Sequence, residues 1–277
     1  MNEPGPPGPA EPESPGAAEQ HARPVHPAAA ASMNARRVNP WTAFMHAEQV
    51  AKRRAEGVHL PAWMRRTPGE PRWPVTLTVM AAIGLQVVLP DKLNALRYVV
   101  PVLECALLAG LIIANPVRIE RRSRAVAIAS IVLTLLITIA NAASAVLLVR
   151  AILEGKAPHP AVALLGAGAA IWLTNVIAFA LWYWEFDRGG PVHRAGGTSP
   201  YPDLMFPQMA TPNLAPPDWE PRFVDYLYLS FTNATAFSPT DVMPLARWAK
   251  LTMLVQSGVS LALVVLVVAR AVNILGA

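Results

Sequence analysis

Charge is scarce in this sequence, and cysteine is almost absent. Charged residues make up 15% of the 277 residues, hydrophobic residues make up 53%, and the mean hydropathy is +0.34. A soluble chain carries about 25% charged residues, so this composition indicates that lipid solvates much of the chain. The single cysteine, Cys105, lies in an apolar run, which excludes an intrachain disulfide and a thiolate metal cluster.

Motifs of catalysis are also missing. The six histidines have no zinc-ligand spacing, and the sequence contains neither a glycine-rich phosphate loop nor a nucleophile elbow. We therefore expect no catalytic residues, no cofactor, no metal site and no nucleic-acid partner.

Long uncharged runs, by contrast, are frequent. A helix that crosses the hydrocarbon core needs about 20 mostly apolar residues. Residues 125–149, 161–184 and 251–269 carry no charge, residues 98–117 carry only Glu104, and residues 74–90 are uncharged but short. The sequence predicts an all-α integral membrane protein with about five transmembrane helices. We expect a multi-pass protein of the plasma membrane, and the high Ala, Val and Arg content points to a bacterial source.

Composition divides the chain into four parts. Residues 1–40 are rich in Pro, Ala, Gly and Glu and are expected to form a disordered tail. Residues 41–73 alternate basic and aromatic residues, which indicates either an amphipathic segment on an anionic lipid surface or a juxtamembrane flank that only sets topology. Residues 74–160 hold three apolar helical segments, and residues 161–277 form a distinct carboxy-terminal unit.

The carboxy-terminal unit has an unusual order of elements. A helix over 161–184 ends in Trp182-Tyr183-Trp184, an aromatic cluster expected at the bilayer interface. An acidic, proline-rich loop follows, and then an apolar stretch over 223–237 that is too short to cross at about 1.5 Å per residue. Polar residues and the last helix complete the unit. This order predicts a re-entrant half-helix whose carbonyl end favours a cation.

The residues of this half-helix resemble the two-helix pore module of potassium channels. The family pattern reads S-F-x-T-x-T-T-V-G-Y-G-D-x-x-P, followed by L-A-R. Residues 230–247 align with it without a gap and match at Ser230, Phe231, Thr235, Asp241, Pro244 and the run Leu-Ala-Arg. The resemblance implies a homotetramer with a filter-like pore segment made of Thr235, Ala236, Phe237, Ser238, Pro239, Thr240 and Asp241.

The departures from the family pattern lie in the filter itself. Ser238, Pro239 and Thr240 stand where the family has Gly, Tyr and Gly. Those glycines let successive carbonyl groups point inward and replace the hydration shell of the ion, whereas Pro239 fixes its φ angle and lacks an N–H. The resemblance thus implies a pore-loop fold with a non-standard filter for monovalent cations. In the last helix, Gln256, Gly258 and Ser260 are expected to line the path. The alternative is that Gly258 and the serines Ser257 and Ser260 are small residues at a helix contact.

Glu104 is the one acid in the middle of an apolar run. An ionisable residue inside a membrane is by default a functional-site hypothesis. The alternative is a neutral carboxyl group that bonds Asn141 or Asn175 of the next two segments.

The orientation of the unit stays open at this point. If all five runs cross, the loop over 185–245 lies on the same side as the basic amino-terminal segment. If 74–90 dips into the membrane without crossing, the loop lies on the opposite side.

Three functions compete on these observations. The first is a cation-conducting homo-oligomer whose acidic vestibule, formed by Asp218, Glu220, Asp225 and Asp241, concentrates cations. The second is a non-conducting structural or regulatory membrane protein derived from the same fold. The third is a proton-coupled transporter or membrane enzyme that depends on Glu104.

Overall fold

The computed structural model describes residues 61–94, 96–119, 123–197, 199, 201–211, 215–235 and 241–276. The chain divides into two units, Met1–Asn39 and Pro40–Ala277, and all described residues belong to the second. The predicted disordered tail and the first part of the basic segment, residues 41–60, lie outside the described residues.

Helices account for nearly all regular structure in the described part of the chain. The longer ones are α2 (Trp73–Val88), α3 (Val99–Ala114), α4 (Arg124–Leu153), α5 (Ala161–Phe186), α8 (Phe223–Thr235) and α9 (Arg247–Leu275). The shorter elements are η2 (Ala62–Met64), η3 (Asp91–Leu93), η4 (Asp187–Gly189), α6 (Pro191–Ala195), β1 (Leu204–Met205), α7 (Pro207–Ala210) and β2 (Met243–Pro244). The all-α prediction is confirmed, and each apolar run is a helix.

Prolines and a capping serine set several helix starts. Pro74 lies in the first turn of α2, where a missing N–H breaks no helical bond. The Ser123 side chain accepts a hydrogen bond of 3.2 Å from the Val126 N–H and so caps α4. Pro160 immediately precedes α5.

Among the described residues, three helices are long and apolar enough to cross a membrane, judged by length and composition. They are α4, α5 and α9. The helices α2 and α3 are apolar but have 16 residues each, which is roughly 24 Å at 1.5 Å per residue. The membrane class predicted from composition agrees with these three helices.

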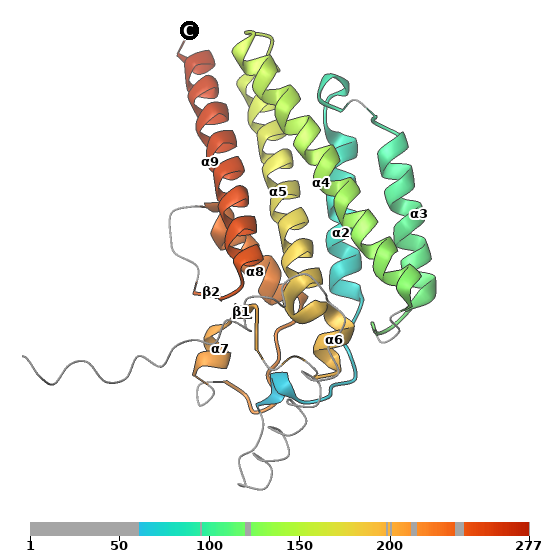
Figure 1. Ribbon diagram of the computed structural model, residues 1–277. Helices are drawn as coiled ribbons and strands as arrows, with labels where there is room; N and C mark the ends of the chain where they lie inside the picture. The colour runs from blue at the N-terminus through green and yellow to red at the C-terminus, as the bar shows by residue number, and fades with distance from the viewer. Residues whose placement is uncertain are drawn as a thin grey trace, which may run out of the picture. The chain divides into compact units, whose positions relative to one another are not determined.

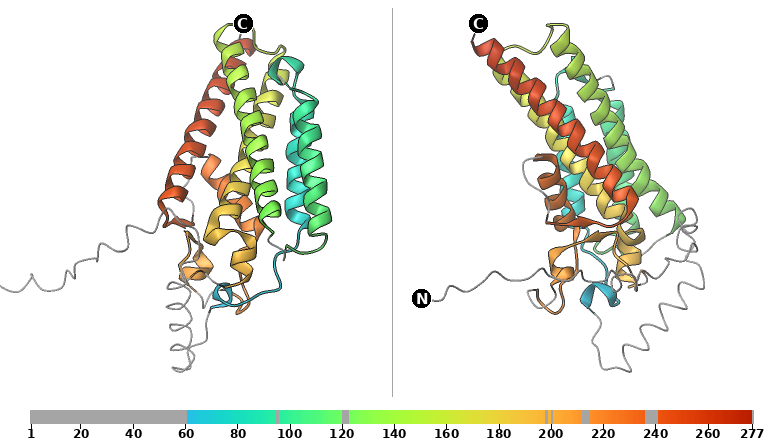
Figure 2. Two further views of the ribbon diagram at one scale, coloured as in Figure 1. Left: turned by 45° about the vertical axis from the view of Figure 1, so that its right-hand side comes forward. Right: turned by 60° about the vertical axis from the view of Figure 1, so that its left-hand side comes forward.

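Helix α5 is the centre of the bundle. It packs against α2, α4, α8 and α9, while α3 packs against α2 and α4 (Figures 1 and 2). The elements α6, α7, β1 and β2 gather at one end of the bundle, where α5 ends and α9 begins (Figure 1). We call this end the strand end. The start of α2 lies beside the end of α3, because the Arg72 N–H bonds the Val117 carbonyl at 3.1 Å.

Close helix contact in this bundle depends on a small residue. A Cβ atom on Gly168 of α5 would lie 2.8 Å from Cγ1 of Val267 on α9. Side chains such as Leu164 and Ile171 are fully buried along the same face of α5. Large apolar side chains on the outer faces of α3 and α9, including Ile113 and Leu254, are exposed. Such a surface is typical of a chain that contacts lipid or a partner.

Candidate functional site

Helix α8 lies beside the halves of α5 and α9 nearest the strand end (Figures 1 and 2). It has 13 residues. The Ser230 hydroxyl donates a hydrogen bond of 2.6 Å to the Val176 carbonyl of α5. Val176 precedes the last residue of α5, Phe186, by about 15 Å along the helix at 1.5 Å per residue. Helix α8 therefore reaches the middle of α5 and stops there.

Gln256 of α9 is the centre of the polar contacts that hold α8. Its Oε1 accepts hydrogen bonds from the Tyr183 hydroxyl at 2.7 Å and from Asn233 Nδ2 at 2.8 Å. Its Nε2 donates to the carbonyl and the hydroxyl of Ser230 at 2.9 and 2.7 Å. Gln256 is fully buried, and these four bonds use the whole hydrogen-bonding capacity of its amide.

A second set of bonds joins the end of α8 to α9. Asn233 Nδ2 donates to the Met253 carbonyl at 3.0 Å, and the Ser257 hydroxyl donates to the Asn233 carbonyl at 3.1 Å. Asn175 Nδ2 of α5 donates to the Ser260 hydroxyl at 3.0 Å. The three helices of the carboxy-terminal unit are thus tied together by polar bonds inside an apolar bundle.

The residues expected along the inner helix separate into two groups. Gln256 and Ser260 are fully buried and bond to α5 and α8 of the same chain. Gly258 lies on an exposed face of α9. A Cβ atom at Gly258 would meet nothing within 4 Å, so that face has room for another molecule.

The filter-like segment begins where α8 ends. Thr235 is the last residue of α8, and its hydroxyl donates to the Thr232 carbonyl at 2.7 Å. Ala236, Phe237, Ser238, Pro239 and Thr240 lie outside the described residues.

Beyond this segment the chain is back at the strand end. Asp241 is exposed, and Met243–Pro244 pairs antiparallel with Leu204–Met205. The Leu245 and Ala246 N–H groups donate to the Asp203 carbonyl at 2.9 and 3.2 Å. The start of α9 is therefore fixed to the loop that follows α5.

A buried ion pair, which the sequence analysis did not single out, joins the segment before α2 to α6. Arg194 Nη2 lies 2.7 Å from Glu70 Oε1, and both residues are only 5% exposed. The Trp184 indole N–H donates to the other oxygen of Glu70 at 2.8 Å. Burial by itself lowers the pKa of Arg194, but Tyr226, Glu70 and Asp187 outweigh that effect and raise it above its ordinary value. The guanidinium therefore stays charged.

Asp187 extends this cluster from the end of α5 to the start of α8. Its Oδ2 accepts hydrogen bonds from the Tyr226 hydroxyl at 2.6 Å and from Arg188 Nε at 3.3 Å. Its Oδ1 accepts from the backbone N–H groups of Asp203 and Leu204 at 3.3 and 3.4 Å. Asp187 is fully buried, so its charge fixes α8 in place and is not presented to solvent.

The chain reverses sharply after α5 through three residues with positive φ angles. Arg188, Gly189 and Gly190 have φ values of 51°, 82° and 98°. A Cβ atom on Gly190 would lie 2.9 Å from the Glu185 carbonyl oxygen, so glycine is required there. Arg188 is held in this unfavourable region by bonds from its N–H to Asp203 at 2.7 Å and from Nη1 to the Trp63 carbonyl at 2.8 Å.

Two residues of the aromatic cluster at the end of α5 are buried. Tyr183 and Trp184 are 0% and 4% exposed and bond Gln256 and Glu70. Both side chains therefore pack inside the protein, where they bond to buried polar partners.

The four acidic residues expected to form a vestibule differ from one another in solvent exposure and in hydrogen-bond or ion-pair partners. Asp218 and Asp241 are exposed, whereas Asp225 is half-buried and accepts a bond of 2.8 Å from the Arg222 N–H. Glu220 lies 3.9 Å from the Arg222 side chain. Burial raises the pKa of Asp225. Only part of this acidic charge is therefore open to solvent.

Glu104 is fully buried, and its partner comes from α2. Gln86 Nε2 donates to both Glu104 oxygens, at 3.2 and 3.1 Å. The predicted partners, Asn141 and Asn175, are wrong. The reason is that α2 and α3 form an antiparallel pair, and Asn175 bonds Ser260 instead.

No group of three or more His, Cys, Asp or Glu side chains within the described ranges is arranged to hold a metal ion. Comparison with protein-family models, with curated proteins and with solved structures gives no match to this chain.

Proposed function

We propose that this chain is the subunit of a homotetrameric, pore-loop membrane protein of a bacterial plasma membrane that conducts monovalent cations. In this proposal α2, α3, α4, α5 and α9 cross the bilayer, and α8 re-enters it from the strand end. The segment from Thr235 to Asp241 lines the cation path through a filter that differs from that of potassium channels.

The observation that carries the proposal is the position of α8. A 13-residue helix lies against α5 and α9, ends beside their middle, and is followed by a chain that is back at the strand end by Met243. Non-helical backbone is tolerated at membrane depth only where it is buried in protein or lines a water-filled cavity. A water-lined path beside the end of α8 meets that condition.

The direction of α8 supports a cation as the transported species. The carboxyl end of a helix carries about half a negative charge, and here that end precedes the filter-like segment. The hydroxyl groups of Thr235, Ser238 and Thr240 add oxygen atoms of the kind that replace water around a cation.

An exposed apolar face of α9 supports assembly with other copies. Leu254, Val255 and Leu261 are 69%, 56% and 50% exposed, and Gly258 lies among them. A single pore loop does not enclose a path, so the proposal requires several subunits around a common axis.

The test is cation flux from liposomes that contain the purified protein. Potassium and sodium gradients are compared for the wild-type protein, for Pro239→Tyr in the filter-like segment, and for Pro217→Tyr, an exposed proline in the preceding loop. We expect flux in the wild-type protein, changed flux or selectivity in Pro239→Tyr, and no change in Pro217→Tyr. Equal flux and selectivity in all three proteins would show that the filter-like segment does not line the cation path.

A non-conducting membrane subunit of the same fold is the second candidate. The observation in its favour is that Gln256 and Ser260, which were expected to line the path, are enclosed within the chain. Absence of flux from a protein shown to be a folded tetramer would favour this second function.

A further inference from the structure

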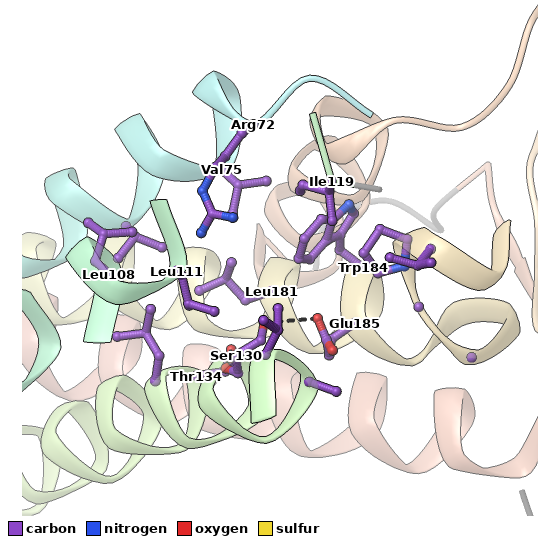
Figure 3. A pocket seen from close by; sticks show the side chains of 18 residues that line it. Arg72, Val75, Leu108, Leu111, Ile119, Ser130, Thr134, Leu181, Trp184 and Glu185 are labelled. Atoms are coloured by element: carbon purple, nitrogen blue, oxygen red, sulfur yellow. Dashed lines mark hydrogen bonds between the residues drawn. The ribbon is translucent and has the colours of Figure 1, made fainter. Parts of the chain in front are cut away.

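The Arg72 side chain enters a small cavity near the strand end. Figure 3 shows it running from the start of α2 toward Leu111 and Leu181. The cavity has a volume of about 60 Å³ and is lined by α2, α3, α4 and α5. A water molecule needs roughly 10 to 15 Å³ of such volume. The cavity therefore has room for a small polar group together with water.

Arg72 forms no ion pair in the part of the chain that the structure describes. The residue is 7% exposed, its Nε has no hydrogen-bond partner there, and none of the ion pairs among those residues includes it. Burial lowers the pKa of the guanidinium, which is the direction expected for a cation without a compensating anion. A buried charge is costly unless it is paired, so this position favours an anion.

The backbone around Arg72 is fixed on both sides. The Arg72 N–H donates to the Val117 carbonyl at 3.1 Å, and the Ile119 N–H donates to the Glu70 carbonyl at 3.1 Å. The Glu70 side chain is held in turn by Arg194 at 2.7 Å. These bonds fix the backbone from which the Arg72 side chain enters the cavity.

The other walls of the cavity suit an amphipathic ligand. Most of them are apolar, including Leu108 and Leu133, and polar groups appear at Ser130, Thr134 and Glu185. The Ser130 hydroxyl donates to Glu185 Oε2 at 3.1 Å (Figure 3). The apolar walls would contact the hydrocarbon part of a ligand, while its anionic group faces Arg72.

We propose that this cavity binds a phosphate group at Arg72, carried either by a membrane phospholipid or by free phosphate. A planar guanidinium matches phosphate oxygens in a bidentate fashion. Trp73, next to Arg72, is 65% exposed, and tryptophan is enriched at the level of lipid headgroups. The lipid source fits both the apolar walls and this position.

The test uses the full chain, purified in dodecyl maltoside because that detergent contains no phosphate. The two probes are phosphatidylglycerol, whose headgroup carries hydroxyls, and inorganic phosphate. Retention of the lipid is measured by native mass spectrometry, and stabilisation by phosphate is measured from the shift of the thermal melting curve. The variants are Arg72→Gln, which removes the charge, Ala127→Leu, which fills the cavity, and Arg66→Gln, an exposed arginine that serves as the control.

We expect phosphatidylglycerol to bind the wild-type protein and Arg66→Gln equally. Binding should weaken roughly 10- to 100-fold in Arg72→Gln, the effect of losing charged hydrogen bonds, and also fall in Ala127→Leu. If phosphate alone gives this pattern, the ligand is the free ion. Equal binding of both probes by all four proteins, or no binding of either probe by the wild-type protein, would overturn the proposal. Ala127→Leu keeps the test decisive if Arg72→Gln does not fold.

Discussion

Replacing Gln256 with leucine removes the side chain that makes the central hydrogen bonds to α8. The Tyr183 hydroxyl is fully buried and loses its acceptor at 2.7 Å. The remaining partners keep other bonds, because Asn233 still donates to the Met253 carbonyl and Ser230 still donates to the Val176 carbonyl. The buried Tyr183 hydroxyl is left without an acceptor, and several interhelical hydrogen bonds are weakened. Together these effects should lower the free energy of unfolding by about 2 to 4 kcal/mol.

A double-mutant cycle with Tyr183→Phe isolates this contact. In the wild-type background, Tyr183→Phe removes one hydrogen bond and should cost about 1 kcal/mol. In the Gln256→Leu background, Tyr183→Phe removes a buried hydroxyl that has already lost its acceptor. The free energy of unfolding should then stay the same or rise. The two residues are in contact, and a coupling energy of about 1 kcal/mol or more is expected.

The assay is reversible unfolding in mixed micelles of mild detergent and dodecyl sulfate, followed by far-ultraviolet circular dichroism. Ile113→Ala, on the exposed face of α3, is the control and should change the free energy by less than about 0.5 kcal/mol. If Tyr183→Phe costs the same in both backgrounds, Gln256 does not accept the Tyr183 bond. The anchoring of α8 through Gln256 would then be refuted.

Three further perturbations test other parts of the fold. Arg194→Gln leaves the Glu70 carboxylate buried without its partner and should cost about 3 to 5 kcal/mol; an unchanged melting temperature would contradict the ion pair. Gly168→Ala should cost about 1 to 3 kcal/mol through its contact with Val267, and the added substitution Val267→Ala should restore most of it in the same melting assay. Burial raises the pKa of Asp225, so the folded state binds a proton more tightly than the unfolded state, and stability falls as the pH rises through that raised pKa. Asp225→Asn should flatten this dependence in unfolding curves measured across pH, and a dependence that is unchanged would exclude Asp225 as its source.

Helix positions were predictable because their signals are local. The run over 161–184 corresponds to α5, Ala161–Phe186, and the stretch over 223–237 corresponds to α8, Phe223–Thr235. In both cases an apolar run is bounded by proline or by polar residues, and no knowledge of the rest of the chain is needed to find it.

The buried charges were not predictable from local sequence. Glu70, Asp187 and Arg194 lie in loops or short helices that, as sequence, look solvated, and they are buried only because residues distant in sequence surround them. The partner of Glu104 was missed for a related reason, since any of several polar residues was chemically suitable and only helix packing selected Gln86. The acid-rich composition of the loop after α5 likewise gave no sign that Asp187 bonds Tyr226.

The sidedness of the chain around α8 is the most direct test of the re-entrant pore loop. Cys105 is the only cysteine, so Cys105→Ser gives a background for single substitutions Asp218→Cys before α8, Asp241→Cys after the filter-like segment, and Gly276→Cys after α9. Each protein is placed in sealed vesicles and treated with a membrane-impermeant maleimide. We predict that the first two positions are labelled from one side and the third from the other. Labelling of positions 218 and 241 from opposite sides would contradict a re-entrant loop.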